Sequence, residues 1–131
     1  MDSNLIVKRS ELEFAEAWLR ADGILVYSPR PDLRIDLETA QQILILGKKL
    51  VDHPVPVLVH MGNVLRVTRE ARDLFASDDY TKVAEQSALL VTSPVSRVVS
   101  NFFVGLNKPL YPLRVFTDEN DAIAWLKGFL Q

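Results

Sequence analysis

The stretch from Val83 to Pro112 constrains the fold more than any other part of the chain. An apolar run that ends in Ala88-Leu89-Leu90-Val91 has the composition of a strand buried on both faces. Ser93 and Pro94 follow, and these residue types suit the N-cap and the first position of a helix. The apolar residues of this helix are predicted to share one face: Val95, Val98, Val99, Phe102, Phe103 and Leu106. A helix that starts directly after a buried strand predicts an α/β fold.

The N-terminal part of the chain predicts a hairpin. Residues 11–19 fit a helix almost as well as a strand, but the Asp22-Gly23 turn and the β-rich run after it favour two antiparallel strands. The expected strands are Glu11–Leu19 and Gly23–Ser28. The proline-rich segment 28–32 is predicted to be a surface loop.

Alternating strands and helices are expected after the hairpin. Asp36 and Thr68 are the expected N-caps of two helices, Thr117 that of the last helix, and residues 61–67 are expected to form a loop. The remaining strands are predicted at Val55–His60, at the run ending in Val91, and at Tyr111–Phe116. The fold class is therefore α/β, with a single-layer mixed sheet of about five strands, an N-terminal hairpin followed by parallel strands, and about four flanking helices.

Length and composition exclude several classes of protein. The 131 residues, 48% of them hydrophobic, suffice for one core, so we expect a single domain over 1–131 whose residues 1–10 are a candidate flexible segment. The formal charge of −2 gives no global attraction for nucleic acid, and no apolar run is long enough to span a membrane. The absence of cysteine excludes disulfides, and no secretory signal is recognisable, so a cytoplasmic location is expected.

A small polar site is one hypothesis for the segment that follows the Val55–His60 strand. His60 ends this strand, where ligands collect in open α/β sheets, and Asn63, Arg66, Thr68 and Ser93 are expected nearby. Such residues could bind an anion or carry a regulatory hydroxyl. The simpler alternative is that Thr68 and Ser93 are only helix caps and Arg66 is solvated.

Neither a catalytic nor a metal-binding motif accompanies these residues. His53 and His60 have no third ligand at a typical spacing, and no serine lies in a nucleophile elbow. We therefore expect no enzymatic activity, no metal and no cofactor. Phe102 and Phe103 cannot point in the same direction on a helix, so with Tyr111 they form a candidate interaction surface.

The order of the predicted elements resembles that of the STAS, or SpoIIAA-like, domain. More narrowly, the chain resembles an uncharacterised bacterial branch of that fold. The segments that carry this resemblance are Ser93-Pro94-Val95-Ser96-Arg97, Asn101-Phe102-Phe103 and Leu106-Asn107-Lys108-Pro109-x-Tyr111-Pro112. The resemblance covers about Glu11 to Leu130 and implies a binding or switching module, in some members controlled by phosphorylation.

In that family the modified hydroxyl lies in an Asp-Ser-Ser/Thr-Gly pattern at a helix start. The corresponding residues here are Val67-Thr68-Arg69-Glu70, so Arg69 occupies the position of the modified hydroxyl and only Thr68 keeps one. We therefore expect a regulatory or protein-interaction module, with an unknown protein or a second copy of the chain as its partner. The alternative is a carrier of a small apolar or anionic ligand, since the fold family resembles lipid-carrier domains.

Overall fold

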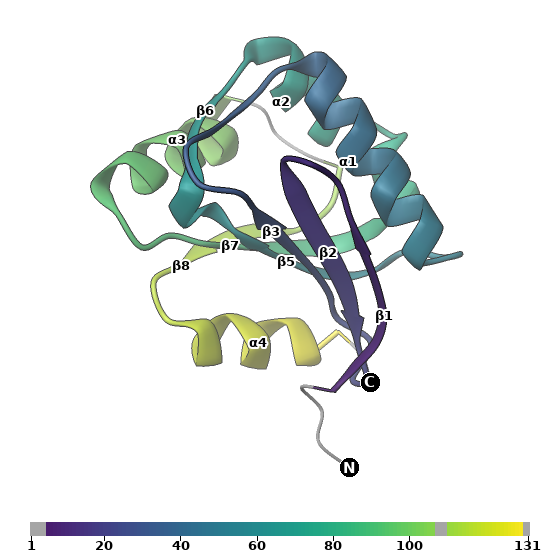
Figure 1. The fold of residues 1–131 in the computed structure, drawn as a ribbon. Coiled ribbons are helices and arrows are strands. Elements are labelled where there is room, and N and C mark those ends of the chain that lie inside the picture. The colour runs from purple at the N-terminus through teal and green to yellow at the C-terminus, as the bar shows by residue number, and fades with distance from the viewer. Residues whose placement is uncertain (1–4, 107–109, 130–131) are drawn as a thin grey trace.

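Six strands form one mixed sheet in the order β1-β2-β3-β5-β7-β8, in a computed structural model that describes residues 5–106 and 110–129 (Figure 1). The strands of this sheet are β1 (Ile6–Glu11), β2 (Ala15–Arg20), β3 (Leu25–Pro29), β5 (Val55–His60), β7 (Ala84–Leu90) and β8 (Leu113–Phe116). The α-helices are α1 (Leu37–Leu50), α2 (Arg69–Phe75), α3 (Pro94–Leu106) and α4 (Glu119–Lys127). Two short 3-10 helices, η1 (Met61–Asn63) and η2 (Tyr80–Lys82), lie in the connections.

The predicted mixed sheet and its flanking helices are confirmed. β2 and β3 form the expected antiparallel hairpin, with Trp18 opposite Val26, and β3, β5, β7 and β8 run parallel. β1 is a further strand that the sequence did not predict, and it pairs antiparallel with β2. Its residues are almost all exposed, so no alternation of apolar and polar side chains marks it as a strand.

Part of the loop predicted at 61–67 forms a strand, and it pairs with a short strand that lies just after the loop predicted at 28–32. β4 (Leu33–Ile35) and β6 (Val64–Val67) form a separate two-stranded parallel sheet. Such short strands give little sequence signal, and each is only partly buried.

Two predicted helix caps are confirmed, whereas the hairpin strands β2 and β3 begin at Ala15 and Leu25, later than the predicted Glu11 and Gly23. Asp36 and Thr68 cap α1 and α2 as predicted, because their side chains accept the N–H groups of Thr39 and Ala71. The prediction that Thr117 caps the last helix is wrong: the cap is Asp118, whose carboxylate accepts the Asp121 N–H at 3.0 Å. β8 also begins two residues later than predicted, at Leu113.

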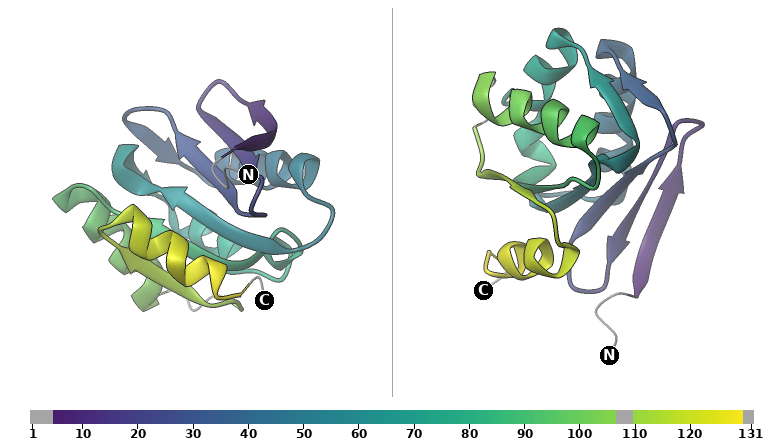
Figure 2. Two further views of the ribbon diagram at one scale, coloured as in Figure 1. Left: turned by 90° about the horizontal axis from the view of Figure 1, so that it is seen from below. Right: turned by 90° about the vertical axis from the view of Figure 1, so that its left-hand side faces the viewer.

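The helices cover the two faces of the sheet unequally. α1, α2 and α3 lie on one face and α4 alone lies on the other, beneath β5, β7 and β8 (Figures 1 and 2). Strand alternation divides the core accordingly, since Val57 packs toward α1–α3 while Leu58 packs toward α4. Among the described residues, no helix has the length and hydrophobicity needed to cross a membrane.

The hairpin turn contains a nearly buried ion pair, and a lysine at the end of α4 approaches it. Arg20 donates to both carboxylate oxygens of Asp22, at 3.1 and 2.8 Å, and Lys127 of α4 lies 3.7 Å from the same carboxylate. Arg20 and Asp22 keep only about a tenth of their side-chain surface exposed. The bidentate geometry fixes the turn that the sequence predicted from Asp22-Gly23.

α1 approaches the sheet closely at Gly47. A Cβ atom at this position would collide with the hydroxyl oxygen of Tyr27 and would lie 2.9 Å from a methyl group of Val83. The Tyr27 hydroxyl donates to the Ile43 carbonyl of α1 at 3.2 Å, so the ring is held where the helix passes. Glycine is therefore required here for packing, although it disfavours the helix itself.

Gly47→Ala is expected to lower the free energy of unfolding by about 1–3 kcal/mol, because overpacking outweighs the gain in helix propensity. Tyr27→Phe removes the colliding oxygen, so the same alanine should cost less in the Tyr27→Phe background. Urea unfolding of the four proteins of this double-mutant cycle measures the difference. An equal cost in both backgrounds would contradict the close approach described.

Candidate interaction surface

The N-terminus of α3 is fixed by a network of serine hydroxyls. Ser93 Oγ accepts the Ser96 N–H at 3.1 Å, which confirms the predicted capping role of Ser93. Ser96 Oγ in turn accepts the backbone N–H groups of Thr92 and Ser93, at 3.2 and 3.1 Å. Because these groups hold the first turn, the rotation of α3 about its axis is set at its beginning.

That rotation leaves Val95 and Val98 of α3 exposed to solvent. Ser96 and Ser100 are fully buried, whereas Val95 and Val98 keep 49% and 56% of their surface exposed. Of the three valines predicted to share one face, Val99 packs against the core and the other two do not. Ser96 and Ser100 are one helical turn apart, and their small side chains suit close packing of α3 against β6 and η1.

A groove runs beside this exposed face. Val98 and Val99 of α3 border it on one side, and Leu65 and Arg66 of β6 with Arg72 of α2 border it on the other. The volume of the groove is about 230 Å³. Arg72 is held in place because its Nη1 donates to the Val67 carbonyl at 2.8 Å. The groove therefore combines an apolar wall with guanidinium groups.

The strands and helices that border the groove, and the neighbouring β4, carry further exposed arginines without acidic partners among the described residues. Arg34 and Arg66 lie opposite each other on β4 and β6, and both are exposed, as are Arg69 of α2 and Arg97 of α3. Within residues 5–106 and 110–129, none of these four forms an ion pair with a carboxylate. Like charges on directly paired strand residues repel each other. This corner of a chain with a net charge of −2 is therefore locally positive.

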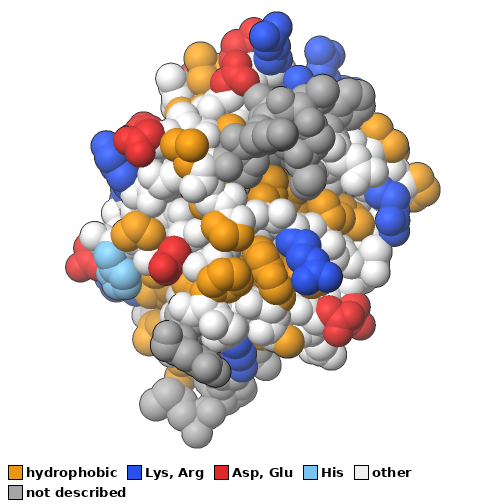
Figure 3. Space-filling view, turned by 180° about the vertical axis from the view of Figure 1, so that it is seen from behind, with side chains coloured by type: hydrophobic (Ala, Val, Ile, Leu, Met, Phe, Trp, Pro, Cys, Tyr) orange, Lys and Arg blue, Asp and Glu red, His pale blue; other side chains and the backbone are white. Residues whose placement is uncertain are grey.

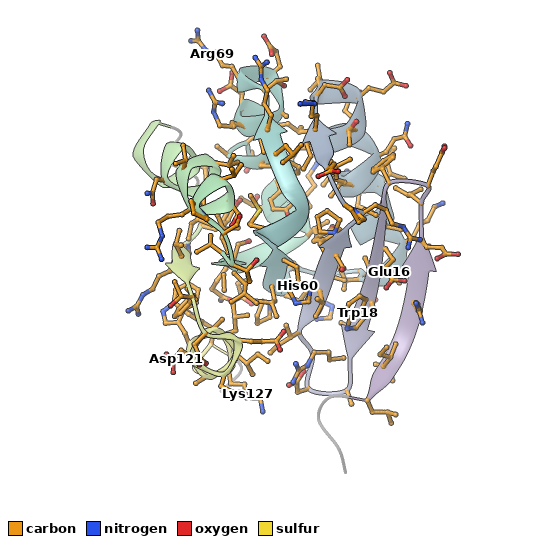
Figure 4. The ribbon with its side chains drawn as sticks, turned by 60° about the vertical axis from the view of Figure 1, so that its left-hand side comes forward. Glu16, Trp18, His60, Arg69, Asp121 and Lys127 are labelled. Atoms are coloured by element: carbon orange, nitrogen blue, oxygen red, sulfur yellow. The ribbon has the colours of Figure 1, made fainter. Side chains whose placement is uncertain are left out.

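The other candidate residues from the sequence divide between two sides of the sheet. His60 points toward α4, where its Nε2 lies 3.1 Å from Glu119 Oε1 and its ring meets Trp18 edge-on. Arg69 is the first residue of α2, and it lies far from His60 in the layer of helices on the opposite face of the sheet (Figure 4). β5 ends with His60 on one face, and β6 then carries the chain to the opposite face, so the expected grouping of His60 with Arg66 and Thr68 does not form.

Several predicted residues have structural positions. The hydroxyls of Thr68 and Ser93 serve as helix caps, as the simpler alternative proposed. Tyr111 is buried and donates to the Phe75 carbonyl at 2.7 Å, so its side chain packs in the core and only its edge reaches a surface hollow. The side chains of Asn63, Phe102 and Phe103 lie outside the described residues. No group of three potential metal ligands occurs among the residues described.

Comparison with known proteins identifies the fold and a family. A model of a domain of unknown function, DUF7793, matches residues 17–130. The chain is similar to the crystal structure of an uncharacterised DUF3478-family protein with a SpoIIAA-like fold from Shewanella loihica PV-4, with 19% identity, coverage of 96% of this chain and 98% of that one, and a TM-score of 0.53. This similarity confirms the expected SpoIIAA-like fold.

A second similar structure is a protein of unknown function from Arthrobacter sp. FB24. It is 35% identical, the match covers 84% of this chain and 90% of that one, and the TM-score is 0.31. No curated protein matches the chain.

Two substitutions test the orientation of α3. Val98→Ser is expected to change the free energy of unfolding by less than about 0.5 kcal/mol, because Val98 is half exposed. Ser100→Ala is expected to raise it by about 1 kcal/mol, because the buried Ser100 Oγ has no hydrogen-bond partner among the described residues and alanine favours the helix. Chemical denaturation of both variants measures these changes. The reverse pattern, with Val98→Ser strongly destabilising, would show that the valines face inward.

Proposed function

Because the chain belongs to the DUF7793 family of domains of unknown function, its role has to be inferred from its own surface, and we propose that it is a non-enzymatic protein-interaction module. The partner binds along α3 and the arginine-lined groove beside it. The observation that carries this proposal is the rotation of α3, which buries Ser96 and Ser100 and exposes Val95 and Val98.

The apolar part of this surface supports a partner that buries it. Transfer of an exposed valine into an apolar contact is favourable by about 1–2 kcal/mol. Val95 and Val98 are three residues apart on α3, so one partner segment can cover both, and Leu65 on β6 borders the same groove. Such a surface beside a groove fits an amphipathic segment of another protein.

The charge of the surface defines the polar part of the partner. Arg66 lines the groove, and Arg34, Arg69 and Arg97 are exposed on β4, α2 and α3. None of these four has a carboxylate partner among the described residues. Guanidinium groups bind carboxylates in bidentate geometry. The partner is therefore a protein segment that combines aliphatic side chains with Asp or Glu.

The remaining polar residues support a binding role over a catalytic one. The hydroxyls of Thr68 and Ser93 are used as helix caps, and His60 is hydrogen-bonded to Glu119 of a neighbouring helix. These contacts explain the three residues structurally without a reaction.

Photo-crosslinking in the cells that make the protein tests the proposal. A photoreactive amino acid replaces Val98 in the full chain, and the matched control replaces Ile45 of α1, which is similarly exposed at 53% against 56%. We expect position 98 alone to capture a partner, which mass spectrometry identifies. Crosslinks between two copies of this chain would replace the proposal by self-association, and equal capture at both positions would contradict it.

Binding of the purified partner then tests the chemistry of the surface. Val98→Glu is expected to weaken binding at least tenfold, because it places a carboxylate in the apolar contact. Arg66→Glu is expected to weaken binding and to reduce its dependence on salt, while Ile45→Glu leaves the affinity unchanged. Calorimetry at two ionic strengths measures both effects. Equal losses from Val98→Glu and Ile45→Glu would exclude α3 as the binding face.

A further inference from the structure

A separate cavity lies inside the molecule, between the sheet and the layer formed by α1 and α2. Its volume is about 50 Å³. Ser87 and Leu89 of β7 form part of its floor, and Ile43 of α1 and Phe75 of α2 lie on the opposite side. Protein interiors contain few voids of this size, and this one is large enough to hold a small molecule.

One polar atom in the cavity wall lacks a partner. Ser87 is 2% exposed, and its Oγ makes no hydrogen bond of normal geometry among the described residues. The Tyr111 hydroxyl is its polar neighbour, but that hydroxyl donates to the Phe75 carbonyl instead. A buried hydroxyl without a partner is costly, and an occupant with a donor or acceptor removes that cost. Tyr27 and Tyr111 also line the cavity, and their hydroxyls donate to the Ile43 and Phe75 carbonyls.

The cavity wall excludes a charged occupant. The described side chains that line it include no Asp, Glu, Lys, Arg or His. The tyrosines remain neutral, because burial raises the pKa of Tyr27 and of Tyr111 above the usual range. An ion placed here would lose its hydration without gaining a counter-charge.

Tyr111 separates the cavity from the outside. The same side chain lines the interior cavity and a surface hollow formed with His53, Pro54 and Leu110. Leu110 is exposed, and hydrophobic side chains gather near the middle of the rear face of the molecule (Figure 3). Tyr111 is therefore the described side chain that borders both the cavity and this hollow.

We propose that this cavity is a binding site for a small uncharged molecule with a short apolar body and one hydroxyl-like group, which pairs with Ser87 Oγ. A volume of about 50 Å³ holds roughly two to four non-hydrogen atoms. A ligand of this size binds no more tightly than a Kd of roughly 0.05 mM, so millimolar affinity is expected. This site is independent of the α3 surface.

Methyl NMR of the full chain with 1-propanol tests the site. We expect saturable shifts of the methyl groups of Leu89, Ile43 and Val59, which line the cavity, while exposed methyl groups such as those of Ile45 do not saturate. Acetate, a charged molecule with as many non-hydrogen atoms as 1-propanol, should produce no such shifts. Xenon, an apolar atom, should occupy the same space because it needs no hydrogen bond.

Ser87→Ala and Ser100→Ala form a matched pair for this experiment. Both serines are buried with an unpartnered Oγ, but only Ser87 lines the cavity. Ser87→Ala is expected to weaken 1-propanol binding about threefold to tenfold and to leave xenon binding unchanged. Ser100→Ala should change neither.

Three results would overturn the proposal. The first is the absence of saturable shifts at the cavity methyl groups with 1-propanol, which would leave only water as occupant. The second is an equal response to acetate. The third is an equal effect of Ser87→Ala and Ser100→Ala, which would remove Ser87 from the site.

Discussion

The burial of β5 and β7 on both faces is the constraint on which the rest of the structure depends. Alternate residues of these strands enter two different cores, as Val57 and Leu58 do on β5. Each face must therefore be covered, and the chain supplies three helices on one side and α4 on the other. The close passage of α1 over Tyr27, which requires Gly47, and the Asp22–Arg20 pair near the end of α4 follow from this arrangement.

The same arrangement explains why Val95 and Val98 of α3 face solvent. α3 packs on β6 and η1 through Ser96 and Ser100, whose small side chains fit a narrow contact, and the serine network at its first turn fixes that rotation. Val95 and Val98 remain exposed because α3 lies at the outside of the helical layer with no further element over it among the described residues. One side of α3 therefore packs against the fold through Ser96 and Ser100, while Val95 and Val98 on another side form the proposed binding surface.

β6 connects the two features to which function is assigned. Val67 lines the interior cavity and also borders the groove beside α3, although it is almost fully buried. The sequence predicts a loop at residues 61–67, where β6 forms instead. It also predicts that Arg66 and Thr68 lie near His60, but His60 faces α4. Neither feature could be predicted, because a cavity and a groove are formed by residues distant in sequence whose side-chain directions depend on the packing.

The sequence by itself determined the elements whose signals are local. The buried strands, the Asp22-Gly23 hairpin turn, and the caps at Asp36, Thr68 and Ser93 follow from residue types and short spacings. Only the tertiary structure decided that β1 pairs with β2 and that β4 pairs with β6. It also decided the direction of the valines of α3 and left the Ser87 hydroxyl without a hydrogen bond. Periodicity shows that a helix has an apolar face, but the shapes of its neighbours decide which face they cover.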